Sequence, residues 1–530
     1  MTNSIPEFEE NTNCFLVIGS NTSEGHPLIA TRMLKAQQRG AKILVLDPRK
    51  NQIGHWADCY YAFRPGTDVA VFNGLMNVII SEGLADQAFV DERTEGYEEL
   101  KATVAGYTPD RVAAITGIPV DGLREIARLY AQQRPSAIIY AMGITQHTTG
   151  VDNVKSAANL AMLTGNMGVA GGGVNPLRGQ NNVQGACDMG GLPNVFSGYQ
   201  AVTSVDVQKK FQEAWGATGS LSVGLTVTEM VDAAGDGRVR GLFVMGENPM
   251  VADPDINHAR HCLEQAEFLV VQDIFLSETA QLAHVVLPGA SYAEKDGTFT
   301  GTDRRVQRVR KAIEPIGDSL ADWEIICRLA KAMGAQNFDF ASPEEVMEEV
   351  ARLTPSYAGI SYARLEELGG LQWPCPNPDH PGTPYLHKGK FTRGLGKFHS
   401  LEFKEAVELP DPEFPFTLTT GRLMFHFHTG TMTRRSPKLV NEVQEAYIEI
   451  HPLDAQQIGL NGSRRVCVTS RRGQIVLNVR LTDKITPGVV FIPFHFAESA
   501  ANALTNNAVD PVAKIPEYKV CAVKIEPEGH

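Results

Sequence analysis

The stretch CFLVIGSNTSEGHPLIATRMLKAQQRGAKILVLDPRK, residues 14–50, decides the fold. Residues 15–18 and 42–46 are short apolar runs of strand length, and residues 27–38 between them have the pattern of a helix. A strand, loop, helix and strand in this order predict a right-handed crossover between two parallel strands. Asp47 follows the second strand, where nucleotide-binding sheets hold a ribose or a base.

A second stretch, residues 241–276, repeats this arrangement far along the chain. Gly19 precedes Asp47 by 28 positions, and Gly246 precedes Asp273 by 27 (47 minus 19, and 273 minus 246). In both cases a third predicted strand ends in Pro-Gly, as CYYAFRPG (59–66) and HVVLPG (284–289). The repetition predicts two related nucleotide-binding halves. The alternative is chance, because any large α/β protein contains several such units.

Neither turn carries the usual phosphate fingerprints. There is no GxGxxG after either first strand, which counts against an NAD or FAD dehydrogenase, and no GxxxxGK[ST] phosphate loop.

The bulk composition excludes several classes of protein. The chain has 530 residues with 43% hydrophobic and 21% charged residues, as expected of a globular protein of three or four domains. Its net charge of −13 argues against general nucleic-acid binding. No apolar run is long enough to cross a membrane, and the first residues do not resemble a signal peptide.

The eight cysteines are scattered and form no CxxC pair. Such spacing does not indicate a disulfide framework, an iron–sulfur site or a zinc site, and we interpret them as scattered buried thiols. This interpretation indicates that the protein is in a reducing compartment, so we expect it to be cytoplasmic.

The remaining patterns define the domains. Helices are expected at 109–133, 153–163 and 322–333, a strand at 136–140, and a linker or wrapping segment at 374–410. After Phe414 the sequence alternates β-branched and polar residues between turns, which is typical of a barrel-like β domain.

The stretch NPLRGQNNVQGACDMGG, residues 175–191, is rich in side-chain amides and glycines and contains a single arginine. Surface linkers seldom place one arginine among amides directly after an apolar helix. We interpret the stretch as a polar cradle for a large ligand with many hydrogen-bonding groups, with Arg178 directed at something anionic.

These residues resemble the molybdopterin-guanine-dinucleotide oxidoreductases of the dimethyl-sulfoxide reductase family, and most closely the formate dehydrogenase catalytic subunits. The resemblance covers essentially the whole chain, and RGQNNVQGA is its most specific motif. The supporting stretches are YAMGITQHTTGVDNVKSAANLAMLTGNMG (140–168), NPLRGQNNVQGACDMGGLPN (175–194), VMGENP (244–249), QDIF (272–275) and NALTNNAVDPVAKIPEYK (502–519).

The resemblance implies an α/β fold of two nucleotide-binding α/β sandwich domains related by duplication, followed by a C-terminal β-barrel. The expected boundaries are 1–180, 181–395 and 400–530, with the second domain completed in the family by an N-terminal part. The implied cofactor is bis-molybdopterin guanine dinucleotide carrying molybdenum or tungsten, and the implied substrate is formate or CO2.

The same resemblance assigns residues to the cofactor. The first dinucleotide would contact Gly19, Ser20, Asn21, Glu24, Asp47, Arg49, Arg64, Gly66 and Asp68. A pterin would contact Met142, Gly143, Gln146 and Gln180, and the second dinucleotide would contact Gly246, Glu247, Asn248 and Asp273. From the barrel, Arg422, His428, Thr429, Thr433, Asn502, Tyr518 and Lys519 would close over the pterins.

Arg178 is the expected catalytic residue, because a guanidinium can hold the formate carboxylate with two parallel hydrogen bonds. The alternative is an arginine that pairs with a cofactor phosphate. His147 is expected to be a hydrogen-bond partner rather than a catalytic base. His426 and His428 would share a strand face, but without a third ligand they do not indicate a metal site.

The chain departs from the family at its start. The family's cysteine-rich segment for a 4Fe–4S cluster, and the selenocysteine or cysteine that ligates the metal, are not in this sequence. An in-frame UGA codon upstream is one explanation, and a split subunit that supplies electron transfer is the other. We therefore expect this polypeptide alone to be inactive. Two alternatives stay open: a molybdopterin enzyme acting on another oxyanion, and a catalytically inactive scaffold subunit.

Overall fold

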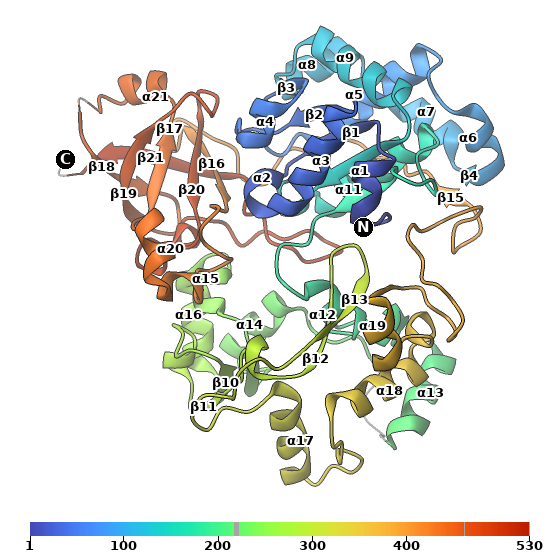
Figure 1. The fold of residues 1–530 in the computed structure, drawn as a ribbon. Coiled ribbons are helices and arrows are strands. Elements are labelled where there is room, and N and C mark those ends of the chain that lie inside the picture. Colours follow the sequence, from blue (N-terminus) through green and yellow to red (C-terminus); the bar gives the residue numbers. More distant parts are fainter. Residues whose placement is uncertain (217–221, 461, 529–530) are drawn as a thin grey trace. The chain divides into compact units, whose positions relative to one another are not determined.

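The structure is a computed structural model that describes residues 1–216, 222–460 and 462–528 (Figure 1). The chain forms two compact units. The first comprises Met1–Gly179, Val251–Asn257 and Tyr385–His530, and the second comprises Gln180–Met250 and His258–Pro384. Within the described ranges, every helix is too short or too polar to span a bilayer.

A five-stranded parallel sheet forms the centre of the α/β part of the first unit. Its order is β3-β2-β1-β5-β6, with β1 in the middle, so that Leu16 lies opposite Leu44 on one side and Ile138 on the other. The strands are β3 (Cys59–Tyr61), β2 (Lys42–Leu46), β1 (Cys14–Ile18), β5 (Ser136–Tyr140) and β6 (Val174–Pro176). The expected strands and the helix at 27–38 are confirmed.

Both faces of this sheet are buried, which explains why its strands are continuous apolar runs. Leu16 and Ile18 point into a core shared with helices α5, α9 and α11, whereas Phe15 and Val17 point into a second core with α1 and α3. Each buried side chain of this kind stabilises the fold by about 1.5–3 kcal/mol. The helices of this part are α1 (Ile5–Glu10), α2 (Thr22–Gly25), α3 (Pro27–Gln38), α4 (Gln52–Trp56), α5 (Asp68–Ser81), α6 (Gln87–Arg93), α7 (Tyr97–Ala105), α8 (Pro109–Thr116), α9 (Val120–Gln132), α10 (Met142–Thr145) and α11 (Gly150–Leu163).

The strand order places a topological switch point between β1 and β5. From β1 the chain builds outward through β2 and β3, then crosses to β5 and β6 on the other side. Open α/β sheets bind ligands outside the carboxyl ends of the strands at such a point. The loops after β1 and β5 are therefore the expected ligand-binding position of this sheet.

The first unit also contains the expected β-barrel. Six strands close in the order β16-β20-β17-β19-β18-β21 around an apolar core that includes Leu418, Ile448 and Val466. The strands are β16 (Phe416–Gly421), β17 (Tyr447–Ile450), β18 (Arg465–Thr469), β19 (Gln474–Leu481), β20 (Val489–Pro493) and β21 (Cys521–Pro527), with helices α20 (Pro437–Glu442) and α21 (Pro452–Gln457). Before the barrel, the expected wrapping segment adds β15 (Gly396–Lys397), which pairs with β4 (Thr94–Glu95).

The second unit contains a three-stranded parallel sheet of order β11-β10-β9 and an antiparallel sheet of order β12-β13-β14. The three strands expected in residues 241–289 are thus confirmed as one parallel sheet. The strands are β7 (Val195–Phe196), β8 (Gln200–Ala201), β9 (Gly241–Met245), β10 (Phe268–Asp273), β11 (Val285–Pro288), β12 (Gly297–Thr300), β13 (Arg305–Val309) and β14 (Leu371–Gln372). The helices in this stretch of the chain are α12 (Val183–Asp188), α13 (Val205–Trp215), α14 (Val227–Gly235), α15 (Pro249–Ala252), α16 (Ile256–Gln265), α17 (Asp322–Ala332), α18 (Pro343–Leu353) and α19 (Tyr362–Leu368).

Candidate functional site

Four of the predicted site residues follow four neighbouring strands of the five-stranded sheet. Gly19 comes after β1, Asp47 after β2, Gly143 after β5 and Arg178 after β6. Because the strands are all parallel, their carboxyl ends lie along one edge. The topology thus brings together residues up to 159 positions apart (178 minus 19).

At the switch point the backbone segments of Gly19 and Gly143 touch. The Gly143 N–H donates to the Gly19 carbonyl at 3.0 Å. A Cβ on Gly143 would lie 2.4 Å from that oxygen, and a Cβ on Gly19, whose φ is +55°, would lie 2.8 Å from the Gly143 carbonyl carbon. Both positions therefore require glycine, because a side chain at either one would push the two backbone segments apart.

Two cationic side chains from the barrel part lie near this edge, the buried Lys519 and the half-buried Arg422. The Lys519 ammonium donates to the Thr420 carbonyl at 2.7 Å, and burial, reinforced by the charge of Arg422, lowers the pKa of Lys519 to about 7. Burial also lowers the pKa of Arg422. Desolvation raises the pKa of Asp47, near Lys519, to about 6. A bound anion would offset the cost of desolvating these cations, so the site favours a negatively charged ligand.

Asp68 presents a buried carboxylate without a hydrogen-bond partner in the described structure. The residue begins α5, is 1% exposed, and neither Oδ1 nor Oδ2 accepts a hydrogen bond. Burial raises its pKa to about 6, although the charge of His147 opposes this. The buried Oδ1 of Asn502 also lacks a partner. Unsatisfied buried acceptors are costly, so these groups suit a ligand that offers hydrogen-bond donors.

His147 is held between two carboxylates. Its Nδ1 lies 3.2 Å from Glu517 Oε1, its Nε2 lies 2.9 Å from the Gly143 carbonyl oxygen, and Asp68 Oδ2 lies 3.9 Å from Nε2. Burial alone would lower the pKa of His147, but the Glu517 hydrogen bond and both carboxylate charges raise it above the usual range. This environment supports the interpretation of His147 as a hydrogen-bond partner.

The loop that carries Arg178 is fixed through its backbone. The His26 Nε2 lies 2.7 Å from the Arg178 carbonyl oxygen, and Arg422 Nη1 donates to the Gly179 carbonyl at 2.9 Å. The half-buried Arg178 lies near Tyr140, since its charge acts on the pKa of the Tyr140 hydroxyl. These contacts fix the backbone from which the Arg178 side chain extends.

The barrel loop after β16 corrects one expectation. His426 and His428 lie in a loop and not on a strand, so they do not share a strand face. His426 Nε2 lies 3.0 Å from the Val443 carbonyl oxygen, and the His428 carbonyl bonds His495 Nδ1. Burial and the charge of Arg422 lower the pKa of His428 to about 4, so its imidazole is neutral at pH 7.

Further predicted residues of the first unit stabilise their own loops. Ser20 and Thr22 share a hydrogen bond of 2.8 Å, and Asn21 Oδ1 accepts from Ser23 at 3.3 Å. Thr429 bonds Thr431 at 2.8 Å. Glu24, Met142 and Gln146 are partly buried around α2 and α10, Gly66 has a φ of +83° just before α5, and Thr433 Oγ1 accepts from the Phe427 N–H at 3.0 Å.

Arg64 and Arg49 make protein contacts that the sequence did not predict. Arg64 is exposed and donates to the Ala114 and Ile115 carbonyls. Arg49 is buried and bonds the Glu449 carboxylate of β17 through Nε and Nη2. The proposed contact of either residue with a nucleotide stays a prediction.

Two barrel residues hold the segment Val251–Asn257, which belongs to the same unit. The Asn502 amide donates to the Val251 and Ala252 carbonyls, each at 3.0 Å, and the Tyr518 hydroxyl donates to the Ala252 carbonyl at 2.8 Å. These contacts fix the Asn502 side chain while leaving its Oδ1 without a partner.

In the second unit, the turn after β9 repeats one hydrogen bond of the first. The Gly246 N–H donates to the Gln272 carbonyl at 2.8 Å, just as the Gly19 N–H donates to the Leu46 carbonyl at 3.1 Å. Asn248 is buried and bonds Thr279 and Glu278, and Asp273 Oδ1 accepts from the Ile274 N–H at 2.6 Å. Gln180 and Glu247 belong to this unit as well.

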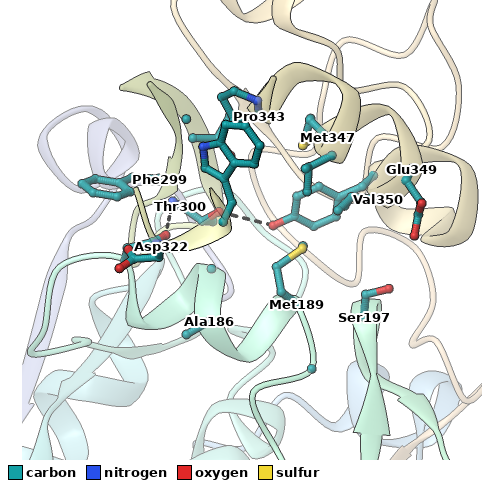
Figure 2. Close-up of a pocket in the computed structure, with 18 of the residues that line it drawn as sticks. Ala186, Met189, Ser197, Phe299, Thr300, Asp322, Pro343, Met347, Glu349 and Val350 are labelled. Carbon is teal, nitrogen blue, oxygen red and sulfur yellow. Dashed lines mark hydrogen bonds between the residues drawn. The ribbon is translucent and has the colours of Figure 1, made fainter. Parts of the chain in front are cut away.

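The second unit also contains a cavity of about 580 Å³ whose wall is mainly apolar and aromatic (Figure 2). Met189, Met347 and Val350 line it. Thr300 and Tyr357 also line it, and their hydroxyl groups share a hydrogen bond. None of the predicted site residues lines this cavity.

Two glutamates that contact predicted site residues, Glu449 and Glu517, were not predicted from the sequence. Glu449 bonds Arg49 across a sequence separation of 400 positions, and Glu517 bonds His147 across 370 positions. Glu449 lies in no motif, whereas Glu517 lies in the stretch 502–519 that carries the family resemblance but does not single out this glutamate.

Comparison with known proteins gives a consistent result. Residues 1–332 match the family described as "Molybdopterin oxidoreductase", and residues 416–522 match "Molydopterin dinucleotide binding domain". The chain is 52% identical to F420-dependent formate dehydrogenase 1 subunit alpha of Methanococcus maripaludis, over 99% of this chain and 78% of the relative. It is 39% identical to formate dehydrogenase H of Escherichia coli, over 99% and 74% respectively.

Among solved structures, acetylene hydratase from Pelobacter acetylenicus is similar, with a TM-score of 0.76 and 22% sequence identity. The match covers 99% of this chain and 78% of the hydratase chain. At this identity the likeness supports the fold only.

Proposed function

Because this chain belongs to the molybdopterin oxidoreductase family, we propose that it binds a molybdopterin dinucleotide and oxidises formate within a larger assembly. The reaction is HCOO⁻ → CO2 + H⁺ + 2e⁻, or its reverse. The observation that carries the proposal is the identity of 39–52%, over 99% of the chain, to proteins named as formate dehydrogenases.

The residues present fit such a cofactor. A pyrophosphate needs positive charge, which the buried Lys519 and the half-buried Arg422 provide near the switch point. Pterin and guanine rings offer several N–H donors, and the unsatisfied oxygens of Asp68 and Asn502 are buried acceptors for them. We therefore place one dinucleotide along the carboxyl edge of the five-stranded sheet.

A second dinucleotide in the second unit is also part of the proposal. It rests on an equivalent pair of residues. Gly246 follows β9 as Gly19 follows β1, and Asp273 ends β10 where Asp47 follows β2. When bound, the cofactor supplies a molybdenum or tungsten centre that accepts the two electrons of formate.

Arg178 is the proposed substrate-binding residue. It follows β6 at the cofactor edge, is half-buried, and its backbone is fixed by His26 and by the Arg422 contact to Gly179. A guanidinium in a partly desolvated site binds a carboxylate with two charge-assisted hydrogen bonds. Such positioning would orient the formate C–H bond toward the reaction centre and lower the entropic barrier.

We propose that electrons leave through an iron–sulfur cluster held by other polypeptide. All eight cysteines lie in the described residues and are free, and among those residues no three or more cysteines lie together. The described cysteines therefore offer no place for a cysteine-ligated cluster.

The test is substrate-dependent dye chemistry on the holoenzyme together with cofactor analysis. We expect formate to reduce methyl viologen and nitrate not to oxidise the reduced dye, with guanine nucleotide and molybdenum or tungsten released on denaturation. Nitrate turnover without formate turnover would instead support another oxyanion as substrate. Protein without pterin and metal would support an inactive scaffold.

A further inference from the structure

Three side chains with different metal-binding atoms lie together in the second unit, on helices α14 and α16. His258 Nε2 lies 2.9 Å from Asp232 Oδ1 and 3.5 Å from Cys262 Sγ. All three donor atoms lie within 4.8 Å of one another. Among the described residues, no other group of three or more histidine, cysteine or acidic side chains comes together in this way.

The local sequence explains the arrangement. His258 and Cys262 are four residues apart on α16 and so share one face of that helix. Gly235 at the end of α14 allows the close approach, because a Cβ there would lie 2.5 Å from Cys262 Sγ. The glycine thus admits the sulfur to the helix–helix contact, where Cys262 is 2% exposed.

From this geometry we propose that Asp232, His258 and Cys262 form a binding site for Zn²⁺ or a similar divalent transition metal ion. Imidazole nitrogen, thiolate and carboxylate are the ligands that Zn²⁺ takes, at about 2.0–2.3 Å each. Bonds of that length at tetrahedral angles separate the ligand atoms by about 3.3–3.6 Å. The spacings in this cluster need only small side-chain rotations to match, and a water molecule would complete the coordination.

The charges around the cluster favour a bound cation. Asp236 is already paired with Arg238 at 2.8 Å, so Asp232 is the carboxylate left to face Cys262 and His258. A bound cation would stabilise the thiolate form of Cys262.

The site is separate from the proposed formate chemistry. None of its three residues belongs to the predicted cofactor or substrate residues, and all three lie in the second unit. A bound ion would link α14 to α16 and stabilise the folded state of that unit by mass action.

The experiment is a Co²⁺ titration of the full 530-residue chain after treatment with a chelator. Co²⁺ bound to a thiolate gives a charge-transfer absorption band, and we expect one equivalent of this signal per chain, displaced by Zn²⁺. Cys262→Ser should abolish the band, and His258→Ala should weaken Co²⁺ binding at least tenfold. The thermal midpoint should rise with Zn²⁺ in the wild type but not in Cys262→Ser.

Two matched controls separate this site from adventitious binding. Cys327→Ser changes another buried cysteine of the same unit, and His261→Ala removes the histidine next to Cys262, so both should keep the full signal. Far-UV circular dichroism checks that each variant is folded. A band that survives in Cys262→Ser, or a wild type that binds Co²⁺ no more tightly than millimolar, would overturn the proposal.

Discussion

The Arg49 guanidinium forms a two-point ion pair with the Glu449 carboxylate, with Nε–Oε2 and Nη2–Oε1 distances of 2.6 and 2.8 Å. The two side chains are only 11% and 6% exposed, and Arg49 also lies over the Phe491 ring at 4.4 Å. This pair joins the end of β2 to barrel strand β17 within the first unit. The ion pair therefore fixes the Arg49 side chain, two positions after Asp47.

Removing one partner of this pair should destabilise the chain strongly. Glu449→Met leaves the buried guanidinium of Arg49 without a counter-charge, which costs about 3–5 kcal/mol. The double variant Arg49→Met/Glu449→Met should be close to wild type, because two apolar side chains of similar size replace the pair. Urea unfolding of the four proteins in a double-mutant cycle measures the coupling. The exposed pair Arg128–Glu82 is the control and should show less than about 1 kcal/mol.

Gly143→Ala should prevent both correct packing and cofactor binding. The new methyl group would lie 2.4 Å from the Gly19 oxygen and 2.5 Å from its Cα, both backbone atoms that cannot move away cheaply. We expect a large loss of bound guanine nucleotide and a lower thermal midpoint. Gly25→Ala is the control, since nothing lies within 4 Å of its Cβ position. Full cofactor content in Gly143→Ala would contradict the proposed cradle.

Arg178→Lys tests the substrate contact. The ammonium keeps the charge but loses the two-point geometry, a loss of about 1.5–3 kcal/mol, or about 10- to 150-fold in kcat/KM for formate. Steady-state kinetics of the holoenzyme measure it, with cofactor content determined in parallel. Arg128→Lys, on the surface, should change neither value. If Arg178→Lys loses cofactor while retaining kcat/KM per bound metal, the arginine binds a cofactor phosphate instead.

Asp68 should make the cofactor-free chain less stable as pH rises. Its pKa is raised to about 6 in the folded state, against 3.8 for an ordinary aspartate, so the folded state holds the proton more tightly. Stability is then greatest below pH 3.8 for this group and falls as pH rises to 6, by about 3 kcal/mol. Asp68→Asn removes this fall. The stability of the variant relative to wild type should therefore increase from pH 4.5 to pH 7.5.

Thermal unfolding of the cofactor-free proteins at the two pH values measures this difference. Asp91→Asn, an exposed aspartate on α6, should behave as wild type at both. The same Asp68→Asn variant should bind less cofactor, because the amide is a weaker acceptor for ring N–H groups than the carboxylate. If the stability difference between Asp68→Asn and wild type is the same at both pH values, Asp68 is not the titrating group.

The 530-residue chain purified by itself should not oxidise formate. Its described cysteines form no cluster site, so electrons would have no path from the reaction centre. Methyl viologen reduction by the isolated chain should stay at background, even when the cofactor is present. Turnover similar to that of the holoenzyme would show that this polypeptide is sufficient.

The local part of the fold could be read from the sequence. The apolar runs of β1 and β2, the helix between them and the change to alternating residues after Phe414 depend on neighbours within a few positions, and the structure confirms each. The sequence did not predict β6, so the position of Arg178 at the carboxyl edge of the sheet followed only from the structure.

Only the tertiary structure decided which distant groups meet and how deeply they are buried. The Glu449 partner of Arg49, the Glu517 partner of His147, and Asp232 beside His258 all depend on how separate elements pack. The strand expected at His426 and His428 failed for the same reason, since barrel closure leaves that segment outside the sheet. Desolvation, which sets the pKa of Asp68 and Lys519, arises from atoms contributed by many segments, so no short stretch of sequence contains it.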